Sequence, residues 1–235
     1  MADHLIGSPL AFASNAYATK AWAKFSDIPA LQHPDVDCVQ GSLVQVSPDV
    51  MEATIKLNMT GETVHRSYDY FIAATGLRRN FLVVPQSLTK KRYLLETATH
   101  VRETQHAEQG VVVIGGGAVG IEMAAETKLC HPSIKVTLVH SRDQLLSAEP
   151  VTSECKEVAL HALREAGVEV ILNQRVMDVT ADDQKKALAR IVTLQDGTTI
   201  PASQIITAIS KSVPATSYLP RSVLNDDGLV RIDDQ

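Results

Sequence analysis

The feature that most constrains this sequence is a glycine cluster directly after a short apolar strand. Val111 to Ile114 has the sequence VVVI, which is typical of a strand buried in a parallel sheet. Gly115-x-Gly117-x-x-Gly120 follows at once, and the residues from 118 to about 129 predict a helix. A strand, a GxGxxG turn and a helix in this order form the dinucleotide-binding fingerprint.

Each glycine of the fingerprint has its own physical role. Gly115 permits the tight turn, Gly117 lets the backbone approach a pyrophosphate, and Gly120 lets the helix pack closely on the strand. The helix N-terminus adds N–H donors and the positive end of a dipole, which both favour a phosphate. A glycine-rich turn in a Rossmann-like domain that binds no nucleotide is the alternative interpretation.

The residues about 20 positions beyond the fingerprint contact the ribose in such folds. Here they are His140-Ser141-Arg142, where an aspartate or glutamate would accept hydrogen bonds from a free 2′-hydroxyl. Ser141 and Arg142 instead suit a 2′-phosphate. The sequence therefore favours NADP over NAD, with a solvent-exposed Arg142 as the alternative.

The surrounding pattern predicts an α/β fold with a Rossmann-like nucleotide-binding domain. We expect strands at 135–140, 168–172 and 204–209, helices at 97–109 and 152–166, and a hairpin over 191–200 turned at Asp196-Gly197. Upstream, an alanine-rich segment predicts a helix within 11–25. The apolar run at 68–74 predicts a buried strand.

A weak internal repeat relates the two halves of the chain. A hairpin leads to DYFIAATG at 69–76, and a second hairpin leads to SQIITAIS at 203–210. The fingerprint of the second copy starts 95 residues before Ser210 (210 − 115). The same offset from Gly76 falls before Met1, so the first copy has no glycine fingerprint in this sequence.

Composition excludes several classes of protein. Of 235 residues, 45% are hydrophobic and 21% are charged, as in ordinary globular proteins, and the net charge is −5 with no basic cluster. This balance disfavours nucleic acid as a partner. No apolar run predicts a transmembrane segment and no leader is recognisable, so we expect a cytoplasmic protein. The three cysteines and eight histidines form no metal-binding or dithiol pattern.

Four stretches resemble the apoptosis-inducing-factor-like flavoproteins, and in particular their AMID-like branch of pyridine nucleotide oxidoreductases. They are VVVIGGGAVGIEMAAE at 111–126, KVTLVHSRD at 135–143, LREAGVEVILNQRV at 163–176 and YDYFIAATG at 68–76. The resemblance implies an incomplete FAD-type domain at 1–109, a Rossmann-like NAD(P)-binding domain at 110–212 and a C-terminal return segment at 213–235. It also implies an NAD(P)H-using oxidoreductase that passes a hydride to flavin and then to a quinone or small organic acceptor.

The resemblance also assigns individual residues. Glu122 matches the acid near the nicotinamide–flavin contact, and Thr75 and Gly76 match the turn beside the FAD. The family's first FAD-binding fingerprint and its late Gly-Asp motif are not in this sequence. We therefore expect the chain to be truncated relative to the family, with FAD an unlikely cofactor for the chain as given. It is either a fragment of a longer flavoprotein or a natural short form, and the starting Met1 favours the short form.

Other functions remain open on the sequence alone. A non-redox enzyme (an isomerase, lyase or cyclase) would reuse the vacated cleft for a small-molecule substrate, with Glu122, Tyr17, Lys20 and His140 as general acids or bases. A cofactor-binding regulatory pseudoenzyme that forms a homodimer is a further alternative.

Overall fold

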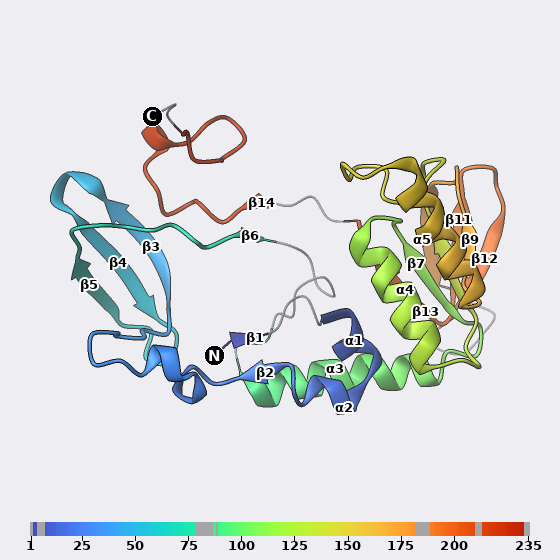
Figure 1. Cartoon of the computed structure of the whole chain (residues 1–235), viewed down its shortest axis with the longest axis horizontal. Coiled ribbons are helices and arrows are strands. Elements are labelled where there is room, and N and C mark those ends of the chain that lie inside the picture. The colour runs from blue at the N-terminus through green and yellow to red at the C-terminus, as the bar shows by residue number, and fades with distance from the viewer. Residues whose placement is uncertain are drawn as a thin grey trace. The chain divides into compact units, whose positions relative to one another are not determined.

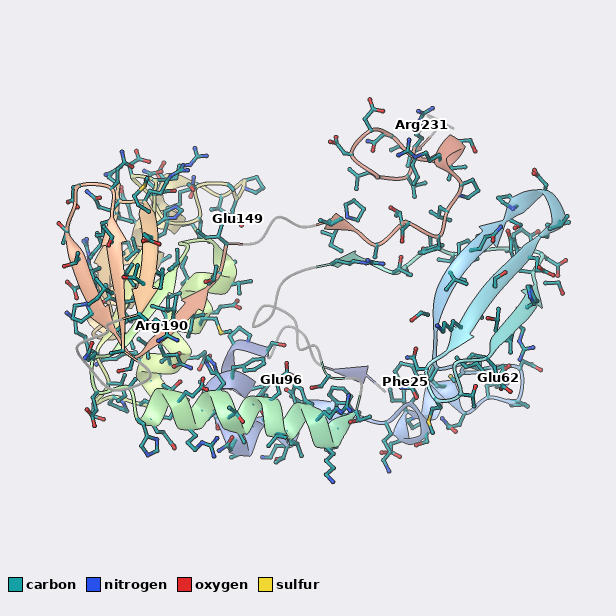
Figure 2. The ribbon with its side chains drawn as sticks, turned by 180° about the vertical axis from the view of Figure 1, so that it is seen from behind. Phe25, Glu62, Glu96, Glu149, Arg190 and Arg231 are labelled. Carbon is teal, nitrogen blue, oxygen red and sulfur yellow. The ribbon has the colours of Figure 1, made fainter. Side chains whose placement is uncertain are left out.

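The computed structural model describes residues 2–3, 8–78, 87, 89–181, 189–209 and 213–232. The chain divides into two compact units (Figure 1). The first comprises Met1–Lys24 and Asn80–Ser210, and the second comprises Phe25–Arg79 and Lys211–Gln235. In Figure 2 the labels Glu96, Glu149 and Arg190 mark the first unit, and Phe25, Glu62 and Arg231 mark the second. The first unit joins residues 1–24 and 80–109 to the Rossmann-like part. The division into an FAD-type domain, an NAD(P)-binding domain and a return segment therefore stays a prediction.

The first unit is built on a four-stranded parallel sheet with the strand order β13-β7-β8-β9. Its strands are β7 (Val111–Ile114), β8 (Val136–Val139), β9 (Glu169–Ile171) and β13 (Gln204–Thr207). Helix α4 (Ala118–Cys130) connects β7 to β8, and α5 (Ser153–Glu165) connects β8 to β9, because parallel strands need crossover connections. The α/β class and these predicted elements are confirmed.

Alternate residues of the parallel strands face two different layers. Val111 and Val113 point to the helices, whereas Val112 and Ile114 point to a second sheet. That antiparallel sheet comprises β10 (Val176–Ala181), β11 (Arg190–Leu194) and β12 (Thr199–Ala202), of which β10 was not expected. The helix-side core consists of Phe12, Ala107, Val111, Val113, Met123, Ala124, Val136, Leu138, Leu145, Leu163, Val168 and Ile206.

The remaining helices of the first unit differ from the sequence-based expectation. Helix α3 (Lys90–Gln105) begins seven residues before the predicted start at 97, because Thr89 caps it by accepting a hydrogen bond from the amide of Arg92. The expected helix within 11–25 is two short ones, α1 (Ser8–Ala13) and α2 (Asn15–Ala18), with Ser14 capping the second. The short strands β1 (Ala2–Asp3) and β2 (Trp22–Ala23) pair with each other.

The second unit contains an antiparallel sheet and a strand pair. The sheet has the order β3-β4-β5, and β6 pairs with β14. The strands are β3 (Gly41–Ser47), β4 (Glu52–Leu57), β5 (Thr63–Ser67), β6 (Leu77–Arg78) and β14 (Val213–Pro214). Single 3-10 turns lie at Phe25–Asp27, Pro29–Leu31, Pro48–Val50 and Arg221–Val223.

The buried strand expected at 68–74 is wrong. This segment is irregular, and the side chains of Tyr70 and Ile72 are 93% and 87% exposed. Tyr68 and Phe71 instead pack their rings against each other, and Phe71 also contacts Tyr218. Within the described residues, no strand pairs with this segment. Without a neighbouring strand its backbone cannot form inter-strand hydrogen bonds, so the apolar run does not become a strand.

Candidate functional site

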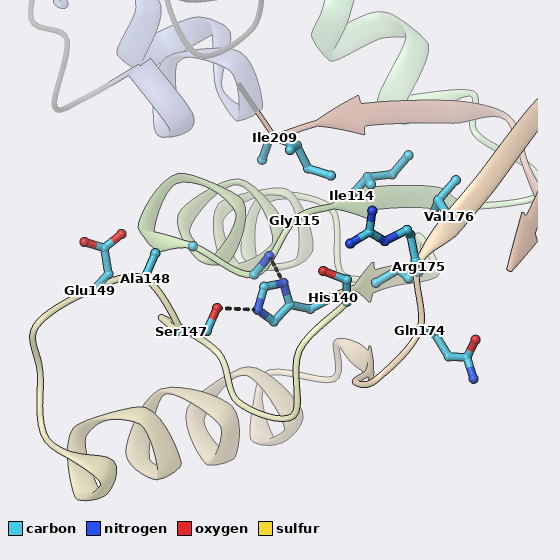
Figure 3. Close-up of a pocket in the computed structure, with 15 residues that line it drawn as sticks. Ile114, Gly115, His140, Ser147, Ala148, Glu149, Gln174, Arg175, Val176 and Ile209 are labelled. Atoms are coloured by element: carbon cyan, nitrogen blue, oxygen red, sulfur yellow. Dashed lines mark hydrogen bonds between the residues drawn. The ribbon is translucent and has the colours of Figure 1, made fainter. Parts of the chain in front are cut away.

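A pocket of about 520 Å³ lies at the carboxyl ends of β7 and β8 in the first unit (Figure 3). Ligands of open α/β sheets bind at this edge. The pocket takes its walls from the glycine turn, the loop after β8, the start of β10 and the end of β13. Its lining residues are Ile114, Gly115, Gly116, Gly117, Val139, His140, Ser141, Ser147, Ala148, Glu149, Gln174, Arg175, Val176, Ala208 and Ile209.

The three fingerprint glycines differ in the space around them. Gly115 has φ +117°, and a Cβ there would lie 3.0 Å from the carbonyl oxygen of Ala208. A Cβ on Gly120 would overlap the carbonyl oxygen of Gly115. A Cβ on Gly117, the N-cap of α4, would meet nothing nearer than a carboxylate oxygen of Glu149 at 4.0 Å. Gly117 therefore leaves open space at a helix N-terminus, as a pyrophosphate requires.

His140 connects the loop after β8 to the glycine turn. The amide of Gly116 donates to Nδ1 of His140 at 3.1 Å, so Nε2 carries the proton and donates to the hydroxyl of Ser147 at 3.1 Å. The amide of Leu146 donates to the carbonyl of Gly116 at 2.8 Å. Both polar backbone groups of Gly116 are thus bonded to one loop (Figure 3).

Burial is the largest influence on the pKa of His140 and lowers it. The positive charge of Arg142 acts in the same direction, while the backbone of Gln144 and the charge of Asp143 oppose it. The ring is therefore neutral near pH 7, and both of its nitrogens are engaged. An acid–base role for His140 would require one of these hydrogen bonds to break.

The ribose-binding loop lies only partly in the pocket. Ser141 lines it, whereas Arg142 is exposed and does not. Sequence analysis missed Arg175, which lies in the connection from β9 to β10 and lines the pocket (Figure 3). The available signal was position: β9 neighbours β8, so the residues that follow both strands meet at the same edge of the sheet.

The other three candidate acid–base residues lie outside the lining of this pocket. Glu122 is largely exposed on α4. Partial burial of its carboxyl, and then the nearby charge of Glu126, raise the pKa of that carboxyl. Tyr17 is half-buried on α2, where it packs against the cluster that contains Trp22. Lys20 follows α2 and is exposed. Their catalytic roles stay predictions.

Thr75 and Gly76 belong to the second unit and link its two chain segments. The Thr75 hydroxyl donates to the carbonyl of Ala215 at 2.9 Å, so the hydroxyl of Tyr218 donates to Thr75 at 2.8 Å. Gly76 has φ +65°, and its carbonyl accepts from the amide of Ala215 at 3.0 Å. Their part in binding FAD stays a prediction.

A parallel Rossmann-type sheet with this glycine turn is typical of the pyridine nucleotide-binding class of proteins. The chain matches the family model for pyridine nucleotide-disulphide oxidoreductases over residues 16–234. It therefore belongs to the pyridine nucleotide-disulphide oxidoreductase family. This membership favours the oxidoreductase interpretation over the non-redox and regulatory alternatives.

Curated relatives place the chain within this family more narrowly. It is 50% identical over 232 residues to oxidoreductase OXR1 of Ajellomyces capsulatus, and the match covers 98% of this chain and 50% of the relative. It is 31% identical over 170 residues to ferroptosis suppressor protein 1 of Homo sapiens, covering 71% of this chain and 45% of the relative. The AMID-like resemblance is confirmed. The chain spans about half the length of the curated relatives it matches.

Solved structures share the fold at low sequence identity. A NAD-dependent persulfide reductase from A. fulgidus gives a TM-score of 0.68 at 20% identity, covering 93% of this chain and 40% of that one. An engineered water-forming NADPH oxidase bound to NADPH gives a TM-score of 0.65 at 16% identity, covering 98% and 50%. These similarities support the Rossmann-type architecture.

Across the described ranges, every helix is too short or too polar to cross a bilayer. In the same parts of the chain, no three histidine, cysteine, aspartate or glutamate side chains gather as a metal site would require.

Proposed function

We propose that this chain binds NADP(H) or NAD(H) in the pocket after β7 and β8 and works as an NAD(P)H-using oxidoreductase on a quinone or small organic acceptor. The observation that carries the proposal is the open space beside Gly117 at the N-terminus of α4. A side-chain-free position there lets the helix amides reach a pyrophosphate. The bound nicotinamide supplies the hydride.

The chain's own residues have distinct roles in this proposal. Gly115 and Gly120 set the turn and its packing against α4, and Gly117 faces the pyrophosphate. His140 holds the turn in place through the amide of Gly116. Ser141 lines the pocket near the expected ribose position.

We further propose a preference for NADP(H), because the first three residues after β8, His140-Ser141-Arg142, include no carboxylate to accept hydrogen bonds from a free ribose hydroxyl. The engineered NADPH oxidase carries changes that replace an aspartate with alanine and introduce two arginines and a serine into an NADH oxidase. The same residue types, serine and arginine, stand at 141 and 142 here.

The described residues of the second unit contain no strand, glycine turn and helix in succession. The proposed reaction therefore includes no step on a flavin bound to this unit. Weak binding of FAD by the chain as given stays a prediction, and the flavin absorbance of the purified protein tests it.

Replacing Gly117 by valine tests the proposed nucleotide site. The nearest atom to a Cβ at this position is 4.0 Å away, so Gly117→Val should fold with an unchanged melting temperature and lose binding of NADH and NADPH. Gly120→Ala is the contrasting variant, because its Cβ would overlap a backbone oxygen and should cost about 1–3 kcal/mol of stability. Calorimetric titration of both nucleotides measures binding. A wild-type chain that binds neither would refute the proposal.

A further inference from the structure

We propose that Arg175 is the residue that recognises the 2′-phosphate of NADP(H) in this pocket. The inference rests on the proposed function, because it requires a dinucleotide bound along the edge after β7 and β8. The sequence pattern assigns recognition of the 2′-phosphate to Arg142 in the loop after β8. The inference assigns it instead to Arg175 in the connection from β9 to β10.

The backbone around Arg175 is fixed beside His140. The amide of Gln174 donates to the carbonyl of His140 at 3.1 Å, and the amide of Gln195 donates to the carbonyl of Arg175 at 2.9 Å. His140 is the first residue after β8, where Rossmann folds place their ribose-binding acid. Residue 175 is therefore held next to the expected ribose position by two hydrogen bonds.

Arg175 is an exposed cation that lines the pocket. Figure 3 shows it extending from the start of β10 over the ends of β7 and β8, on the side of His140. None of the ion pairs formed among the described residues includes Arg175. Because no carboxylate of the described residues pairs with Arg175, its guanidinium can bind an anion that enters the pocket without breaking an ion pair.

NADP(H) offers two anionic groups, and their positions differ. The pyrophosphate fits the N-terminus of α4 at Gly117, close to Glu149, whose carboxylate oxygen lies 4.0 Å from a Cβ built on that glycine. Figure 3 shows Glu149 and Arg175 at opposite ends of the pocket. The 2′-phosphate is the remaining anion, and a planar guanidinium matches a phosphate with two parallel hydrogen bonds.

Arg142 differs from Arg175 in its position. Both arginines are exposed, but only Arg175 lines the pocket. The carbonyl of Arg142 accepts a hydrogen bond from the amide of Asn173 at 3.0 Å, so its backbone supports the connection that carries Arg175. The two arginines are therefore distinguishable by mutation.

The test compares ADP-ribose with 2′-phospho-ADP-ribose, which differ only in the 2′-phosphate and contain no nicotinamide. Binding to the wild-type chain, Arg175→Gln, Arg175→Lys and Arg142→Gln is measured by calorimetric titration. Arg190→Gln is the control, because Arg190 begins β11, the strand that pairs with β10, but lies outside the pocket lining. Circular dichroism checks that each variant is folded.

We expect Arg175→Gln to weaken 2′-phospho-ADP-ribose by about tenfold or more and to leave ADP-ribose within about twofold. Arg175→Lys should recover part of the loss, and Arg190→Gln should change neither ligand. Equal weakening of both ligands would overturn the inference, since Arg175 would then contact a group that they share. A selective loss in Arg142→Gln alone would also overturn it and leave the nucleotide site intact. A wild-type chain that binds neither ligand would refute the proposed function as well.

Discussion

The two copies of the internal repeat have similar sequences and different structures. The second copy forms β13, which lies parallel to β7 and contributes Ile206, 1% exposed, to the helix-side core. Ser210 at its end lies outside the described residues. The first copy, at 69–76, forms no strand, and its Ile72 is 87% exposed. A similar apolar sequence therefore forms a buried strand in the second copy and an irregular segment in the first.

The difference shows what converts an apolar run into a strand. The second copy pairs through four residues with β7, the strand that carries the glycine turn. The first copy has no such partner strand in the described part of the chain. It is held at its end by the side-chain hydrogen bond between Thr75 and Tyr218 and by the backbone hydrogen bond from Ala215 to Gly76. Strand formation therefore depends on the neighbouring strand as much as on the apolar run itself.

Truncating one isoleucine in each copy should give the largest contrast. Ile206→Ala removes buried methyl groups from a closed core and should lower the free energy of unfolding by about 2–5 kcal/mol. Ile72→Ala changes an exposed side chain and should stay within about 0.5 kcal/mol. Urea unfolding followed by circular dichroism measures both. Similar losses would mean that residues 69–76 are also buried in solution.

Acidification should destabilise the anchor of the second copy. Gln204 at the start of β13 donates to Nδ1 of the buried His100 at 3.0 Å and accepts from the hydroxyl of Thr104 at 2.7 Å. Burial, and then the charge of His131, lower the pKa of His100 from 6.5 to about 4. Between these values the unfolded chain binds a proton that the folded chain excludes, so stability falls as the pH falls.

The shift corresponds to a loss of up to ~3 kcal/mol between pH 7 and pH 4. Urea unfolding at pH 7, 6, 5 and 4 measures the slope, and His100→Gln should reduce it by the histidine contribution. The difference between the two slopes isolates His100 from the carboxylates that titrate in the same range. Parallel slopes would show that His100 titrates equally in both states.

The smallest effect is expected at the side-chain anchor of the first copy. Tyr218→Phe removes the hydroxyl that donates to Thr75 and should cost about 1 kcal/mol. The amide of Ala215, which donates to Gly76, should then exchange with deuterium roughly fivefold faster. Tyr68→Phe keeps the ring contact with Phe71 and serves as the control. Unchanged exchange of the Ala215 amide in Tyr218→Phe would show that the hydroxyl does not hold this segment.

Sequence reasoning worked best where local signals agree with the tertiary environment. VVVI, the glycine turn and the following helix are each specified by neighbouring residues, and the structure has them at the predicted positions. The start of α3 was missed because a threonine cap determines it rather than apolar periodicity. Arg175 was missed because its relation to the pocket depends on the order of strands in the sheet, which no local pattern encodes.

The hydrogen bond between Thr75 and Tyr218 also affects the order of assembly during protein synthesis. The two residues are 143 positions apart, and the parallel sheet of the first unit is encoded between them. At about 5–20 residues per second, a ribosome needs roughly 7–30 s to make that interval. During this time β3, β4 and β5 have their partners, while Thr75 and Gly76 do not. The second unit is therefore completed only after the Rossmann sheet has been synthesised, and until then Phe71 lacks its ring contact with Tyr218.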